Sequence, residues 1–122
     1  MSNEETLRQV MRNKQQASLG DAFVNFVYSL ALTQTSGEPQ AVKVSDRILA
    51  DAFKLAGLRK YLGTRISKKD LANASESLLV DAYQKKLITL EESVTTLSEN
   101  PDGLEAGLSE LMKLTAERIA HT

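Results

Sequence analysis

The sequence predicts an all-α fold. Along most of the chain, apolar residues recur three and four positions apart, which is the spacing of one face of a helix. No segment of useful length alternates between apolar and polar residues, as a half-buried strand would. Helix-capping and turn residues, among them Ser45, Gly57 and Ser67, separate the helical segments. We therefore expect a helical bundle.

The composition of the 122 residues narrows the class of protein. A chain of this length can bury a core on its own, and we expect residues 1–122 to form a single domain. There is no cysteine, which excludes disulfides, thiol catalysis and thiolate metal sites. The N-terminal stretch is polar and acidic, unlike a signal peptide, and no apolar run reaches the roughly 20 residues of a membrane span. We therefore expect a cytoplasmic protein without a membrane partner.

The helices can be predicted in chain order. Residues 4–17 form a first amphipathic segment. Residues 18–33 form a second that is apolar on nearly every side, so we expect it at the centre of the fold. Further helices are expected over residues 47–56, 68–86, 90–97 and 104–120, with a short turn-like element over 58–63. Five of the six aromatic residues are expected in the core: Phe23, Phe26, Phe53, Tyr61 and Tyr83.

The second segment contains an unusual carboxylate, Asp21. Asp21, Asn25, Ser29 and Thr33 are spaced four apart, so they form one narrow polar stripe along a helix. A carboxylate on a buried helix needs a partner, a proton or a metal ion. Alternatively, Gly20 ends the first helix and Asp21 is the N-cap of the second, the usual role of Asp after Gly. Both interpretations stay open at this point.

A second candidate site lies on the helix expected over 68–86. Asn73 and Glu76 are three residues apart and therefore share a helix face. An inward Asp on one helix and an inward Glu on another would suit a hard cation such as Mg²⁺. The alternative is that Glu76 is an ordinary solvated residue. Asp81, further along the same helix, is expected to pair with Lys85.

The charges are segregated although the formal net charge is only −1. The stretch from 52 to 69 contains six cations and no acid: Lys54, Arg59, Lys60, Arg65, Lys68 and Lys69. Such a block can hold a polyanion through phosphate contacts. The alternative is a solvated surface with balanced salt bridges.

Three motifs resemble the ribonuclease III family. The Leu-Gly-Asp-Ala sequence at 19–22 resembles the family signature, residues 45–62 resemble its next helix and Tyr-Leu turn, and residues 70–83 resemble its second acidic motif. Two acidic positions of the full-length family are changed here, to Ala17 and Asn73. Compact members called Mini-ribonuclease III also lack the first of these acids and a double-stranded-RNA-binding domain. The chain therefore resembles a compact stand-alone domain, of the Mini-ribonuclease III or archaeal type.

The resemblance implies an endoribonuclease that cleaves double-stranded or structured RNA as a homodimer, using Mg²⁺ or Mn²⁺, in RNA maturation. It implies Asp21 and Glu76 as catalytic metal ligands, Asn73 as a weaker oxygen ligand, Asn25 as a supporting residue and the six cations as RNA contacts. Low sequence specificity is expected, because A-form RNA is recognised mostly by its shape and backbone. The changes at Ala17 and Asn73 leave a second hypothesis: a catalytically degenerate dimer that binds structured RNA or a protein partner.

Overall fold

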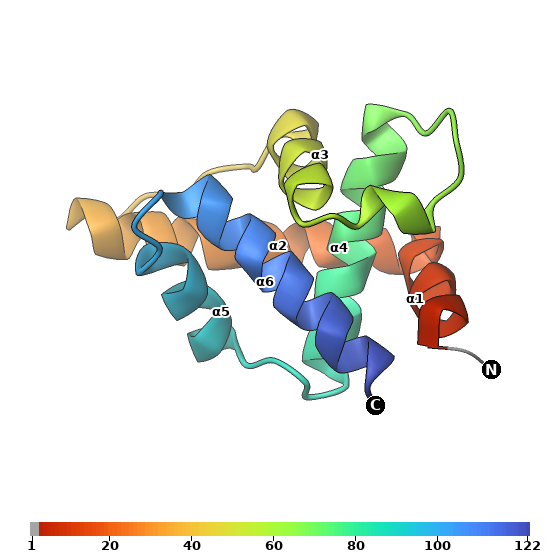
Figure 1. Cartoon of the computed structure of the whole chain (residues 1–122). Coiled ribbons are helices and arrows are strands. Elements are labelled where there is room, and N and C mark those ends of the chain that lie inside the picture. The colour runs from red at the N-terminus through yellow and green to blue at the C-terminus, as the bar shows by residue number, and fades with distance from the viewer. Residues whose placement is uncertain (1–2) are drawn as a thin grey trace.

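The computed structural model describes residues 3–122 (Figure 1). Met1 and Ser2, which begin the polar N-terminal stretch, lie outside the described residues. The described part is all-helical, as predicted. Its elements are α1 (Asn3–Met11), α2 (Lys14–Ser36), α3 (Asp46–Leu55), the 3-10 turn η1 (Arg59–Tyr61), α4 (Lys68–Gln84), α5 (Leu90–Ser98) and α6 (Leu104–Ala120).

The centre of the fold is α4, and the prediction that α2 occupies this place is wrong. Helices α1, α2, α3 and α6 all pack on α4 (Figure 1). Over residues 71–82 of α4, every residue except Asn73 is buried. Ser75 and Ser77 can be buried because their hydroxyls donate to backbone carbonyls, in the case of Ser77 to that of Val10 at 2.6 Å. Small side chains of this kind let neighbouring helices approach α4 from several sides.

Helix α2 buries one face against α4 and leaves another exposed. Phe26 is 53% exposed, and Tyr83 of α4 is 42% exposed beside Phe23, with 4.8 Å between the two ring centroids. The expectation that Phe26 and Tyr83 belong to the core is therefore wrong. Phe53 is fully buried as expected, and Phe23 and Tyr61 are half-buried.

The first helix ends at Met11, well before the expected limit at residue 17. The reason is Asn13, whose side-chain oxygen accepts a hydrogen bond from the N–H of Gln16 at 3.2 Å and thereby caps α2. Asn followed three residues later by Gln is a capping-box pattern, so the sequence did contain this signal. Gly20 consequently lies inside α2, and the interpretation of Asp21 as an N-cap is wrong.

Most other helix limits agree with the prediction. Ser45 and Ser67 cap α3 and α4 by accepting hydrogen bonds from the backbone N–H three residues further on, at 3.2 and 3.0 Å. Helix α2 continues past the expected residue 33 until Gly37, whose φ of 80° ends it. Asp81 forms the expected ion pair with Lys85, at 2.8 Å.

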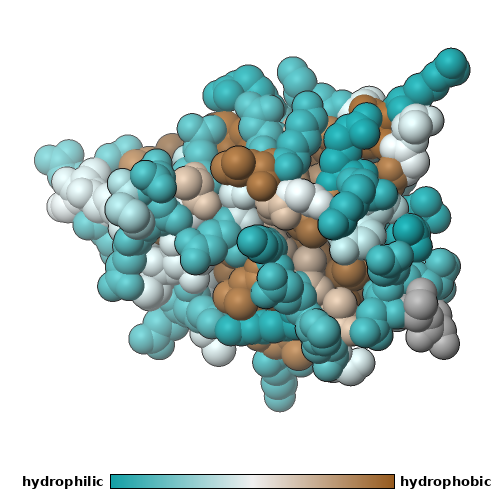
Figure 2. Space-filling view, viewed as in Figure 1, coloured by the Kyte–Doolittle hydropathy of each residue, from teal (hydrophilic) through white to brown (hydrophobic). Residues whose placement is uncertain are grey.

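The outer surface is mainly hydrophilic on the side that carries α3 and α6, with smaller hydrophobic areas between the polar side chains (Figure 2). Among residues 3–122, no helix combines the length and the apolar character that crossing a membrane requires.

Candidate active site

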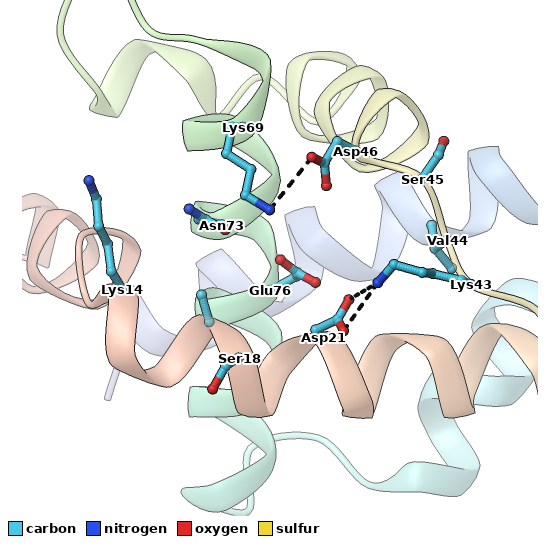
Figure 3. Close-up of a pocket in the computed structure, with 11 residues that line it drawn as sticks. Lys14, Ser18, Asp21, Lys43, Val44, Ser45, Asp46, Lys69, Asn73 and Glu76 are labelled. Carbon is cyan, nitrogen blue, oxygen red and sulfur yellow. Dashed lines mark hydrogen bonds and ion pairs between the residues drawn. The ribbon is translucent and has the colours of Figure 1, made fainter.

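An open cleft of about 610 Å³ lies between α2, α4 and the start of α3 (Figure 3). Two carboxyl groups lie side by side in it, Asp21 from α2 and Glu76 from α4. Asp46, the first residue of α3, and Asn73, one turn before Glu76, also line it. Ala17 contributes an apolar part of the wall. The fold thus brings together residues that are far apart in the sequence.

Gly20 allows the two helices to approach closely enough for this arrangement. A Cβ atom at position 20 would lie 2.1 Å from the carbonyl oxygen of Glu76 and 2.9 Å from its Cβ. Only glycine fits such a contact without moving α2 away from α4. The glycine of the Leu-Gly-Asp motif is therefore a packing residue, and it places Asp21 directly beside Glu76.

The two carboxyl groups share a hydrogen bond and have pKa values on opposite sides of normal. The pKa of Glu76 is raised to about 8, first by burial, then by the hydrogen bond to Asp21 and by the negative charges of Asp21 and Asp46. The pKa of Asp21 is lowered, chiefly by the same hydrogen bond and further by Lys43 and Asn25, against an opposing effect of burial. At neutral pH, Glu76 is mostly protonated and donates to an ionised Asp21.

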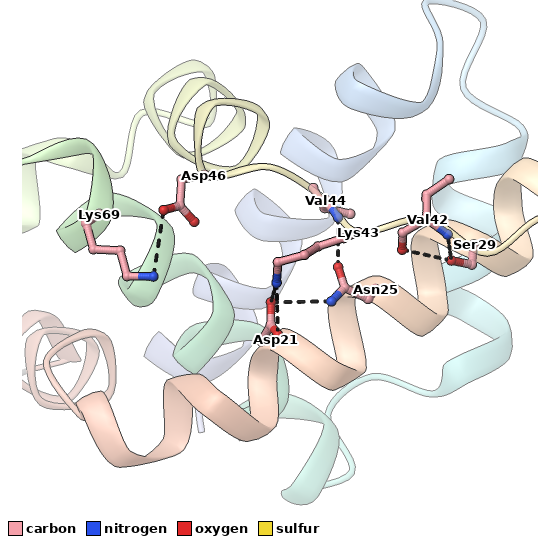
Figure 4. A network of polar contacts seen from close by, with 8 residues as sticks. All are labelled: Asp21, Asn25, Ser29, Val42, Lys43, Val44, Asp46 and Lys69. Atoms are coloured by element: carbon pink, nitrogen blue, oxygen red, sulfur yellow. Dashed lines mark hydrogen bonds and ion pairs between the residues drawn. The ribbon is translucent and has the colours of Figure 1, made fainter.

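The polar stripe of α2 fixes the segment that leads into α3. The hydroxyl of Thr33 accepts from the N–H of Gln40 at 3.0 Å and donates to its carbonyl at 3.2 Å. One turn earlier, Ser29 forms the same pair of hydrogen bonds with Val42, at 2.9 and 3.2 Å (Figure 4). The stripe therefore holds an extended backbone segment along α2.

Asn25 connects this segment to the cleft. Its side chain accepts from the N–H of Val44 at 2.8 Å and donates to Asp21 at 3.3 Å. Between these anchors, Lys43 places its ammonium nitrogen 3.2 and 3.3 Å from the two carboxylate oxygens of Asp21 (Figure 4). Asn25 thus supports both Asp21 and the backbone beside Lys43.

One of the six predicted RNA contacts lies in the cleft. Lys69 lines it and forms an ion pair with Asp46 at 3.7 Å. The other five are exposed but do not line the cleft; they lie on α3, on η1, on the segment before α4 and at the first residue of α4: Lys54, Arg59, Lys60, Arg65 and Lys68.

Sequence reasoning missed three charged residues of the cleft: Lys14, Lys43 and Asp46. Asp46 follows the N-cap Ser45, and an acidic residue at the start of a helix is common enough that it did not indicate a role in a site. Lys43 lies between the helices expected over 18–33 and 47–56, where no helical spacing predicts the direction of a side chain. The signal for its position was the polar stripe on α2, because those side chains need backbone partners.

The donor set suits a hydrated divalent ion. Among the described residues, no group of three or more Asp, Glu, His or Cys side chains is placed to hold a metal. Mg²⁺, however, commonly uses one or two carboxylates, waters and the phosphates of its substrate. Burial and the negative charges of Asp21 and Asp46 hold Glu76 in its neutral form, and a divalent ion bound there would favour its ionised form.

A cleft that combines carboxyl groups with lysines, as this one does, has groups that can bind phosphates together with a divalent ion. The profile of the ribonuclease III family matches residues 14–120. The chain therefore belongs to the ribonuclease III family, whose members are RNA-cleaving endoribonucleases that act on double-stranded RNA and generally use divalent metals. A comparison with curated proteins gives no match.

Proposed function

We propose that this protein is a divalent-metal-dependent endoribonuclease that hydrolyses phosphodiester bonds in double-stranded or structured RNA during RNA maturation in the cytoplasm. The pairing of Asp21 and Glu76 in an open cleft carries this proposal. Family membership supports the class of reaction and of substrate.

Asp21 and Glu76 would hold the ion through carboxylate oxygens, and the amide oxygen of Asn73 would support it. A bound Mg²⁺ or Mn²⁺ supplies an activated water and neutralises charge on the phosphate under attack. Asn25 keeps Asp21 in place by donating to it at 3.3 Å. Gly20 keeps α2 and α4 close enough for both carboxylates to face one ion.

The basic residues outside the cleft supply a surface for the RNA backbone. Lys54, Arg59, Lys60, Arg65 and Lys68 are exposed, and no ion pair to an acid is seen for them within the described residues. Free cations of this kind bind phosphates without reading the bases, which suits recognition of an A-form duplex by shape.

We also propose that the protein is a homodimer. We call the exposed apolar face of α2, with the neighbouring ring of α4, the apolar stripe: Leu19, Ala22, Phe23, Phe26 and Tyr83. Residues 19, 22, 23 and 26 fall on one side of the helix. Large apolar side chains that gather on one exposed face are typical of an association surface.

A degenerate RNA-binding dimer is the second candidate function. The observation that favours it is that the cleft contains Ala17 and Asn73 where the full-length family has acids, so that fewer carboxylates face an ion. Fewer carboxylates give weaker affinity for a hard cation. This candidate predicts salt-sensitive RNA binding that is independent of the metal.

The test uses a labelled RNA hairpin incubated with the protein, with and without Mg²⁺ or Mn²⁺. We expect metal-dependent cleavage that is lost in Asp21→Asn and in Glu76→Gln. Gln has the shape of a protonated Glu, so this variant should keep the fold, which circular dichroism would check. Cleavage that survives both substitutions would refute the assignment of the site. A gel shift without cleavage would support the degenerate dimer.

A further inference from the structure

We propose that Lys43 is a further functional residue of the cleft: its ammonium group neutralises Asp21 until a divalent ion binds, and then moves to a phosphate of the bound RNA. The proposal rests on the proposed nuclease function, which supplies both the ion and the RNA. It would make Lys43 a substrate-contacting residue that also limits access of the metal to the carboxylates.

The backbone on both sides of Lys43 is fixed. Both backbone polar groups of Val42 are bonded to the hydroxyl of Ser29, and the N–H of Val44 is bonded to Asn25. The side chain itself is 75% exposed, and its ion pair is with Asp21. A lysine has a long flexible stem, so the ammonium group can swing while its origin stays at the edge of the cleft.

The position of Lys43 conflicts with a metal on Asp21. The ammonium nitrogen lies within 3.3 Å of both carboxylate oxygens of Asp21, which are the atoms that a divalent ion would use. Two positive groups cannot share these oxygens at such distances without strong repulsion. Binding of the ion therefore requires Lys43 to leave Asp21.

The released ammonium group has a partner in the RNA. Lys43 belongs to the segment that forms the rim of the cleft, and Lys69 lines the cleft from α4 (Figure 3). Both side chains therefore lie beside the carboxylates that an RNA phosphate would approach. Lys69 is engaged with Asp46, whereas Lys43 becomes free once the metal has replaced it. A lysine serves such a phosphate as a mobile point charge.

The first experiment measures Mn²⁺ affinity without RNA, from the electron paramagnetic resonance signal of free Mn²⁺. Removal of an exposed ion-pair partner should tighten Mn²⁺ binding by about two- to fivefold in Lys43→Met. Lys14→Met is the matched control, since Lys14 lines the same cleft but is not bonded to Asp21. Ser29→Ala, which frees the backbone of Val42, should shift the affinity in the same direction as Lys43→Met.

The second experiment measures RNA recognition at saturating Mn²⁺. Lys43→Met should raise the KM for a hairpin by about three- to tenfold, as expected for a lost phosphate contact. If the wild-type protein does not cleave, the dissociation constant of the hairpin, measured by fluorescence anisotropy, replaces KM. Opposite effects on metal and RNA affinity are specific to the proposal, because a variant that simply loses structure would weaken both.

Three results would overturn the proposal: Mn²⁺ affinity unchanged in Lys43→Met, an equal change in Lys14→Met, or Mn²⁺ binding by neither the wild type nor Lys43→Met. Failure of the nuclease function appears separately, as absence of cleavage by a wild-type protein that still binds Mn²⁺. Thermal melting followed by circular dichroism checks that each variant is folded.

Discussion

The protonated state of Glu76 gives a prediction about stability that does not depend on any ligand. The pKa of this carboxyl is about 8 in the folded protein against an ordinary value of 4.5. The folded state therefore binds this proton more tightly than the unfolded state does. Its stabilising effect is complete below pH 4.5 and is lost as the pH rises towards 8 and Glu76 ionises beside Asp21.

The size of the effect follows from the shift. Each pKa unit corresponds to about 1.4 kcal/mol. The shift of the Glu76 pKa from 4.5 to about 8 therefore limits the loss of unfolding free energy to about 5 kcal/mol. The cleft is open, so water can enter and solvate the ionised pair, and we expect a loss of about 3 kcal/mol between pH 5 and 8. In Glu76→Gln the corresponding side chain is neutral at every pH, so this loss should disappear.

The assay is urea unfolding of the wild type and of Glu76→Gln at half-unit intervals from pH 4.5 to 8.5, in metal-free buffer. The difference between the two proteins cancels the titration of the other groups. This difference in unfolding free energy should move in favour of Glu76→Gln as the pH rises. A difference that stays constant from pH 5 to 8 would refute the assignment of a buried, protonated Glu76.

Three further predictions concern the metal, the helix crossing and the dimer. Mn²⁺ binding should release about one proton below pH 8 and tighten about tenfold from pH 6 to 7, because Glu76 must ionise; calorimetry in two buffers that shows no proton release would contradict this. Gly20→Ala should lower stability by about 3 kcal/mol or more by thermal or urea unfolding, whereas Gly63→Ala, with nothing within 4 Å of the added Cβ, should change it little; equal effects would argue against the close α2–α4 contact. Phe26→Glu should yield monomers in analytical ultracentrifugation, and Leu55→Glu, at a 73% exposed residue outside the apolar stripe, should not.

The sequence predicted the helices well because caps and periodicity are local signals. Ser45 and Ser67 have side chains that bond within their own first turn, so their role does not depend on the rest of the fold. Asn13 has an equally local contact, and the helix start there could have been found from its spacing to Gln16. The prediction failed at Gly20 because this glycine is required by the close contact of α2 with α4. The local sequence contains no information about which helix packs there.

The candidate site could be predicted only in part, for the same reason. Asp21 and Glu76 were singled out through two motifs, but the effect of each on the pKa of the other depends on a distance across the fold. Lys43 and Asp46 could not be placed, because their positions follow from the path of the segment between α2 and α3. That path is determined by hydrogen bonds from the polar stripe to backbone groups, which no residue pattern in the segment itself reveals.

The lysines of the cleft affect how a site with few carboxylates could bind a metal ion and RNA together. With Glu76 protonated, Asp21 and Asp46 carry the negative charge, and each is paired with a lysine. A divalent ion that ionises Glu76 and displaces Lys43 would lie among three carboxylates, those of Asp21, Asp46 and Glu76. The ammonium group of Lys43 would then be free at the rim of the cleft. Such an exchange makes the affinity for the metal depend on the RNA, because a phosphate that accepts Lys43 removes the competitor from Asp21. We therefore expect the hairpin to tighten Mn²⁺ binding in the wild type and to do so less in Lys43→Met; equal tightening in both proteins would show that the lysine takes no part in the coupling.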